Sequence, residues 1–75
     1  MMLNEIKPQQ KVRVCYVHLE EDKRKRMYYL GIYPGCVIEK IQSAPFHDPV
    51  IYRVNHIYIV LRNEDTHKIQ VEEIV

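Results

Sequence analysis

Apolar and aromatic residues, many of them β-branched, form two nearly unbroken runs, 50–54 and 57–61, which only the polar residues Asn55 and His56 separate. Such runs are typical of strands, and a two-residue connection predicts a tight β-hairpin. Asn tolerates the left-handed backbone that this turn needs, although His suits it less well than glycine. Residues flanking such a turn face each other, so the spacing predicts three pairs on one face: Val54 with Ile57, Tyr52 with Ile59 and Val50 with Leu61.

A further strand is predicted over residues 11–18, which are rich in β-branched and aromatic side chains, after a lead-in at residues 6–8. Its alternation leaves open which face is buried. One face carries Val12, Val14 and Tyr16, and the other carries Arg13, Cys15 and Val17.

Two more strands are predicted after the middle and near the end of the chain. In residues 36–42, Ile38 and Ile41 break strict alternation, which predicts a β-bulge that bends the strand. In residues 67–71, Ile69 and Val71 are expected to point inward.

A helix is predicted over residues 20–30, because acidic residues open it and basic residues follow, in agreement with the helix dipole. Leu19, Met27 and Leu30 form a narrow apolar stripe. The four consecutive bases at 23–26 spread around the helix, since each residue turns by about 100°, and therefore form a solvated face and not one nucleic-acid patch. A single capped helical turn is predicted at 63–66.

The corner at residues 27–35 organises the chain, because it ends the helix and starts the next strand. Gly31 supplies the left-handed residue that closes the helix, and Pro34 with Gly35 predicts a tight turn with positive φ at the glycine. A second rigid connection is expected at 43–49, where two prolines, Pro45 and Pro49, restrict the loop and Asp48 precedes proline.

Five short strands, one helix inserted after the first and one helical turn predict a mainly β fold. Strands with one apolar face each close most economically into a small, partly open barrel, which hides sheet edges. The chain of 75 residues is expected to form one domain, 1–75, too small for a deep catalytic cleft. Its net charge of +1 argues against long-range attraction to nucleic acid, and residues 1–5 lack the pattern of a secretory signal.

Candidate chemistry is sparse. Cys15 and His18 have a spacing that can share a metal, but a structural zinc site needs a second such pair, so we expect no intrinsic metal site and at most a weak association with ferrous iron. Cys36, His47, His56 and His67 could in principle complete a shell of soft and borderline ligands, but His56 and His67 lie at turn positions where polar residues belong. No phosphate-binding loop or nucleophile motif is present, which argues against an enzyme. Six tyrosines could stack on single-stranded nucleic acid, but three are expected to serve packing instead. These three are Tyr16, Tyr28 or Tyr29, and Tyr52.

Four motifs in order resemble those of the FeoA-type ferrous iron transport protein A family. They are Leu30-Gly31-x-x-Pro34-Gly35, Ala44-Pro45-x-x-Asp48-Pro49, Val60-Leu61-Arg62 and Ile69-x-Val71. The resemblance covers about residues 11–73 and implies an SH3-like barrel. One departure is His47, which stands where the family usually has the glycine of a Gly-Asp-Pro turn.

The resemblance implies a small cytoplasmic accessory protein that regulates ferrous iron uptake. Its partner would be a membrane-embedded ferrous iron transporter with a cytoplasmic GTPase domain, which would bring it to the inner face of the membrane without its own membrane anchor. The alternative is a small-barrel module of a metal-dependent regulatory system that binds a metal ion or nucleic acid directly. Neither alternative is catalytic.

The corner is the best candidate for the partner-docking surface, because a rigid turn presents side chains at little cost in ordering. Leu30 and either Ile32 or Tyr33 are expected to cap the core. The remaining candidates for contact with a partner are Lys25, Arg26, Tyr29 and whichever of Ile32 and Tyr33 faces outward.

Overall fold

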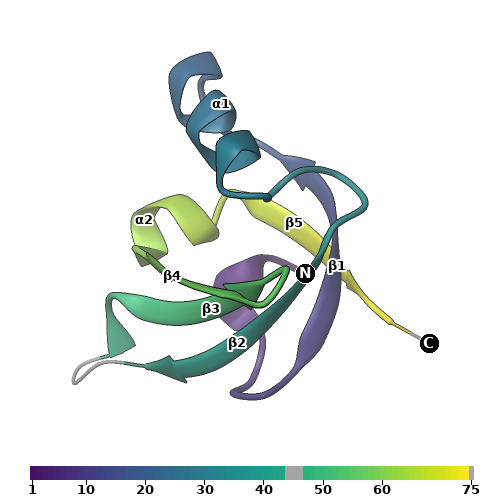
Figure 1. Ribbon diagram of the computed structural model, residues 1–75, viewed down its shortest axis with the longest axis vertical. Helices are drawn as coiled ribbons and strands as arrows, with labels where there is room; N and C mark the ends of the chain where they lie inside the picture. The colour runs from purple at the N-terminus through teal and green to yellow at the C-terminus, as the bar shows by residue number, and fades with distance from the viewer. Residues whose placement is uncertain (44–46, 75) are drawn as a thin grey trace.

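The computed structural model describes residues 1–43 and 47–74, and within these lie five strands, two helices and one turn of 3-10 helix (Figure 1). The prediction of a mainly β chain with one helix after the first strand is confirmed. In chain order the elements are η1 (Leu3–Glu5), β1 (Lys11–Val17), α1 (Glu21–Tyr29), β2 (Val37–Ser43), β3 (Val50–Val54), β4 (Ile57–Leu61), α2 (Asn63–Thr66) and β5 (Ile69–Glu73).

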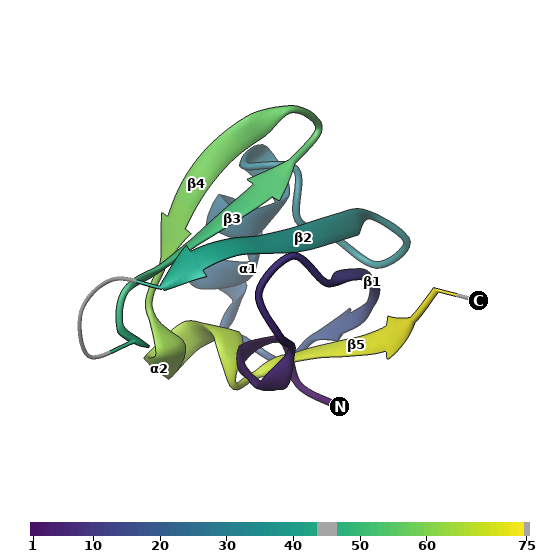
Figure 2. The ribbon, with the colours of Figure 1, turned by 90° about the horizontal axis from the view of Figure 1, so that it is seen from below.

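The strands form one antiparallel sheet in the order β4, β3, β2, β1, β5. Two perpendicular views show that the sheet curls around its inner face, with α1 standing at one end (Figures 1 and 2). In the described part of the chain the terminal strands β4 and β5 do not pair with each other. The barrel is therefore partly open, as the strand pattern predicts.

The hydrophobic core fills the inner face and includes the N-terminal segment, which the sequence presents only as a lead-in. Leu3 is fully buried and Ile6 nearly so. The Lys40 ammonium donates a hydrogen bond of 2.9 Å to the Ile6 carbonyl oxygen and ties this segment to β2. The buried apolar residues are Leu3, Ile6, Val12, Val14, Val17, Leu19, Met27, Ile32, Cys36, Ile38, Val50, Tyr52, Val54, Ile59, Leu61, Ile69 and Val71.

A bulge in β1 decides which side chains of this strand enter the core. Pairing with β5 shifts by one residue between Val14 and Tyr16. Val14 and Val17 are therefore both buried, whereas Tyr16 is 54% exposed. The expectation that Tyr16 serves packing is wrong, because the bulge reverses the alternation beyond it. The corresponding shift in β2, between Lys40 and Gln42, confirms the bulge that the isoleucine spacing predicts.

The hairpin has the predicted register. Val50 faces Leu61, Tyr52 faces Ile59 and Val54 faces Ile57. Asn55 and His56 have φ values of 51° and 68°, so both turn residues adopt the left-handed conformation of a type I′ turn.

The corner ends α1 with the predicted left-handed glycine. The N–H groups of Gly31 and Ile32 donate to the carbonyl oxygens of Tyr28 and Met27 at 2.9 and 2.8 Å, which is the Schellman pattern. Gly31 has φ of 95°, and a Cβ there would lie 3.3 Å from the Val54 side chain. Glycine is therefore required both for its backbone conformation and for the close approach of the hairpin.

The turn that follows the corner matches a type II turn. Gly35 has φ of 99°, and the Cys36 N–H donates to the Tyr33 carbonyl oxygen at 3.0 Å. The Gly35 N–H in turn donates to the Val14 carbonyl oxygen at 2.8 Å, which fixes the corner to β1.

Helix α1 is one residue shorter at each end than predicted, and its apolar stripe is narrower. Leu19 and Met27 are buried, but Leu30 is exposed, so the expectation that Leu30 caps the core is wrong. Leu30 is the last residue before the Schellman glycine, and the chain turns inward only at Ile32.

Helix α2 and β5 occupy nearly their predicted positions. Asn63 is the first residue of α2, and its N–H is capped by the Asp48 carboxylate at 2.9 Å, so the cap comes from a distant loop. Strand β5 starts two residues later than predicted, and Ile69 and Val71 point inward as expected.

Candidate functional site

The corner borders a shallow groove of about 360 Å³ between α1 and the end of β1. We call this the corner groove. Its lining is mostly apolar and aromatic, and two basic side chains stand at the helix side. The lining residues are Val17, Arg24, Lys25, Tyr28, Ile32, Tyr33 and Pro34.

The structure shows which of Ile32 and Tyr33 faces outward from the corner. Ile32 is 1% exposed and forms part of the core beneath the groove, whereas Tyr33 is 40% exposed. Ile32 is thus inaccessible to a partner except as the floor of the groove.

Tyr33 belongs to a group of exposed tyrosines. Its ring centroid lies 5.4 Å from that of Tyr28, which in turn makes an edge-to-face contact of 6.1 Å with Tyr29. Tyr28 lines the groove and was absent from the predicted contact set. The sequence gave no reason to choose Tyr28 over its neighbour Tyr29, because only the packing of α1 against the corner decides which of them lines the groove.

The predicted basic contacts do not lie together. Lys25 stands at the corner groove, where its ammonium lies 3.3 Å from the exposed Glu21 carboxylate one helical turn earlier. Arg26 lines a different groove on the other side of α1. Adjacent helical residues diverge by about 100°, so the sequence pair Lys25 and Arg26 cannot contribute to one small patch.

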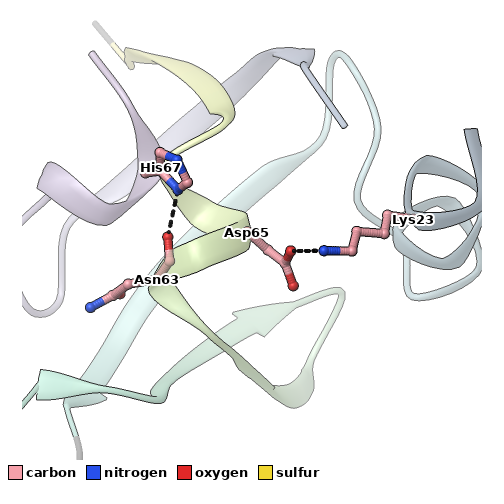
Figure 3. A network of polar contacts seen from close by, with 4 residues as sticks. All are labelled: Lys23, Asn63, Asp65 and His67. Atoms are coloured by element: carbon pink, nitrogen blue, oxygen red, sulfur yellow. Dashed lines mark hydrogen bonds and ion pairs between the residues drawn. The ribbon is translucent and has the colours of Figure 1, made fainter. Parts of the chain in front are cut away.

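The second groove lies between α1, the C-terminal end of β4 and α2, and we call it the α1–β4 groove. The Lys23 ammonium of α1 reaches the Asp65 carboxylate of α2 at 3.1 Å (Figure 3). This hydrogen bond raises the pKa of Lys23. At the end of α2, the His67 ring lies 2.9 Å from the Asn63 carbonyl oxygen (Figure 3).

The loop motif that carries the resemblance has a structural role at α2. Asp48 caps the first N–H of that helix, and the Asn63 side-chain amide donates to the His47 carbonyl oxygen at 2.9 Å. His47 has φ of 63°, so it adopts the left-handed conformation that glycine favours. Pro45 lies outside the described residues.

The candidate metal ligands are engaged separately. The His18 ring nitrogen lies 3.0 Å from the Gln70 side-chain oxygen, and the His18 ring contacts that of Tyr16 in a tilted arrangement, with the ring centroids 4.5 Å apart. Cys36 is buried, which raises the pKa of its thiol. Among residues 1–43 and 47–74, no three His, Cys, Asp or Glu side chains are grouped as metal ligands. Within these ranges, Cys15 and His18 therefore belong to no such group.

The helices of the described ranges are too short and too polar for any of them to cross a membrane.

Known proteins were compared with this chain in sequence and structure. The FeoA domain family matches residues 1–73. A Fe(2+) transport protein A/Fe(2+) transporter FeoB fusion protein from Porphyromonas gingivalis is 45% identical over 49 residues, which are 65% of this chain. The match spans 6% of the length of that fusion protein.

Two solved structures share the fold. The solution structure of the FeoA protein from Chlorobium tepidum is 27% identical and superposes with a TM-score of 0.94, over 100% of this chain and 71% of that chain. The zinc complex of Stenotrophomonas maltophilia FeoA, described as an SH3 domain protein, is 21% identical with a TM-score of 0.81, over 96% and 89% of the two chains. The second likeness confirms the SH3-like barrel. By its sequence over residues 1–73, this chain belongs to the FeoA domain family.

Proposed function

We propose that this chain is an accessory regulator of ferrous iron uptake that binds the cytoplasmic part of a membrane ferrous iron transporter. The observation that carries the proposal is the P. gingivalis relative, which contains a transport protein A region and the transporter FeoB in one polypeptide. Covalent fusion raises the effective concentration of two parts for each other, which is useful when they act as a pair. The family resemblance adds that the contacted part contains a GTPase domain.

Regulation by binding suits the shape of the molecule. The inner face of the small barrel is filled by side chains, and the two grooves beside α1 are shallow. A site of this kind offers contact area and no enclosed reaction space. Any nucleotide chemistry would therefore belong to the transporter, and the chain would act at the cytoplasmic face of the membrane.

The corner groove is the proposed docking surface. Tyr28 and Tyr33 offer large aromatic contact areas, and aromatic side chains carry much of the binding energy at protein interfaces. Their backbone is held by the Schellman motif at Gly31 and the turn at Gly35, so little conformational entropy is lost on binding. Arg24 and Lys25 stand at the rim beside one carboxylate, that of Glu21, so the rim keeps a net positive charge, which favours an acidic surface on the transporter.

Two substitutions test this surface. Tyr33→Ala removes an exposed aromatic contact, and Lys25→Glu reverses the rim charge. Titration calorimetry with the purified cytoplasmic domain of the FeoB transporter should show affinity reduced by about tenfold or more for Tyr33→Ala, as is usual for a central aromatic contact. Circular dichroism should show that both variants remain folded.

Matched controls lie elsewhere on the surface. Tyr16→Ala removes another exposed tyrosine, and Lys7→Glu reverses another exposed lysine. Both should bind as the parent does. Undiminished binding by Tyr33→Ala and Lys25→Glu would move the interface away from the corner, and no binding by the parent would refute the proposed function itself.

A further inference from the structure

The two edge strands of the sheet, β5 and β4, differ in whether another segment of the chain covers them. At β5, the Val71 N–H donates to the Met1 carbonyl oxygen at 2.8 Å, and Met2 forms a β-bridge with Gln70. The N-terminal segment therefore covers that edge. At β4, the outermost strand on the other side, no backbone hydrogen bond other than those to β3 is present among the described residues.

The hairpin geometry identifies the free backbone groups of β4. In a two-residue turn, the flanking residues Val54 and Ile57 form a hydrogen-bonded pair, and such pairs alternate with non-hydrogen-bonded pairs along the ladder. Ile59 and Leu61 are therefore bonded to β3. Tyr58 and Val60 point their N–H and C=O groups away from it.

This edge also lacks the usual features that discourage pairing. Native edge strands are commonly protected by charged residues, proline or bulges. Strand β4 contains only Ile, Tyr, Val and Leu, and its pairing with β3 is regular over all five residues. Val60 is 61% exposed, and its backbone makes no hydrogen bond outside the β3–β4 ladder among the described residues.

The free edge borders the α1–β4 groove, which has a volume of about 300 Å³. Val60 and Leu61 line it but no residue of β3 does, so it lies on the side of β4 that faces away from the sheet. Across the groove lie Met27, which is buried beneath α1, and Leu30, the exposed residue that follows α1. An open slot between an edge strand and a helix is the setting in which extended peptides add to a sheet.

The charges around this slot favour an acidic occupant. Lys23 and Asp65 neutralise each other. In the described part of the chain, no carboxylate lies within ion-pair distance of Arg26 or Arg62, which both line the groove. Glu64 is the one further acidic residue of the lining, so the groove retains net positive charge.

We propose that the α1–β4 groove binds an extended segment of a partner protein, in which apolar and acidic residues alternate, by addition of a strand to β4. Its backbone pairs with the N–H and C=O groups of Tyr58 and Val60. Its apolar side chains contact the exposed Leu30, and its carboxylates approach Arg26 and Arg62. This surface is separate from the corner groove, and the proposal does not depend on the identity of the transporter partner.

The probe is a library of random octapeptides displayed on phage, selected on the intact chain. We expect enriched sequences to alternate apolar residues with Asp or Glu. A synthetic peptide of an enriched sequence should slow amide hydrogen exchange of Tyr58 and Val60 by about tenfold or more, because these N–H groups gain partners. Peptides N-methylated at alternate backbone nitrogens should not bind, since they lack the donors.

Two variants separate strand addition from side-chain contact. Val60→Pro removes an N–H that points away from β3, and proline is tolerated at such edge positions, so Ile59 and Leu61 should keep their slow exchange while the peptide is lost. Val60→Ala retains the N–H and should bind within about threefold of the parent. The double variant Arg26→Glu with Arg62→Glu should weaken binding by about tenfold or more, and Lys7→Glu should leave it unchanged.

Three outcomes would overturn the proposal. The first is a selection that enriches no alternating acidic sequence. The second is bound peptide that protects amides other than those of Tyr58 and Val60. The third is protection of the same two amides by concentration-dependent dimerisation without peptide, which would assign the edge to a second copy of this chain.

Discussion

Residues Leu61 and Val60 are neighbours in β4 but lie on opposite faces of the sheet. Leu61 is 5% exposed and packs in the core, whereas Val60 is 61% exposed. An aspartate introduced at each position therefore meets two different environments under the same change of charge and nearly the same change of size. Leu61→Asp should unfold the domain at neutral pH, and Val60→Asp should be mild.

The magnitude follows from the burial of Leu61. Removing this side chain from the core loses about 2 kcal/mol of apolar burial. The introduced carboxyl has no partner there and must be protonated, which at pH 7 costs about three pH units at about 1.4 kcal/mol each, or about 4 kcal/mol. A domain of 75 residues has a free energy of unfolding of about 4–11 kcal/mol, so the loss is comparable with the whole stability.

Urea denaturation followed by circular dichroism, at pH 7 and pH 4.5, measures both parts of the effect. The folded state of Leu61→Asp holds a carboxyl of raised pKa and binds more protons than the unfolded state, so its stability falls as pH rises above about 4. Relative to the parent, it should regain about 3 kcal/mol at pH 4.5. Leu61→Asn, which loses the apolar contact without a charge, should show no such recovery.

Equal stability of Leu61→Asp and Val60→Asp at pH 7 would show that the inner face of β4 is assigned wrongly. A difference that does not change with pH would show that the carboxyl at position 61 reaches solvent.

Three further predictions concern other parts of the molecule. Asp48→Ala removes the cap of α2 and should lower the free energy of unfolding by about 1 kcal/mol, or Tm by about 4–8 °C, whereas Asp48→Asn should keep part of this stability. An unchanged Tm in Asp48→Ala would contradict the capping role. Burial lowers the pKa of Lys40 below its ordinary 10.5, so the unfolded state binds more protons than the folded state at pH values between the lowered pKa and 10.5, and the free energy of unfolding rises with pH in that range. Urea denaturation at pH 7 and pH 10 should show this rise in the parent and not in Lys40→Met. Anaerobic calorimetry should detect no ferrous iron or zinc bound more tightly than micromolar; one metal per chain, lost in Cys15→Ser or His18→Ala, would contradict this and favour the metal-dependent regulatory module.

Much of the fold is encoded in short stretches of sequence. The register of the β3–β4 hairpin follows from two runs of strand-forming residues and the two-residue turn between them, because both act between residues close in the chain. Gly31 and Gly35 likewise mark positions where the backbone needs positive φ. These features are local, so the sequence alone determines them.

The tertiary structure decided the features that depend on distant partners. Leu3 and Ile6 show no strand or helix period, and they are buried only because β2 and β5 pass beside them. The cap of α2 comes from Asp48, fifteen residues before Asn63, which no local capping pattern shows. Tyr16 is exposed because of a bulge whose position depends on the pairing of β1 with β5.

The candidate surfaces divide in the same way. The sequence identified the corner as a rigid turn beside tyrosines and basic residues, because that is a local feature, but it missed Tyr28. It could not separate Lys25 from Arg26, or choose Ile32 as core and Tyr33 as surface, since each choice depends on which neighbour packs against α1. The α1–β4 groove was absent from the sequence prediction altogether, because it lies between segments that are brought together only when the sheet curls and leaves β4 at its edge.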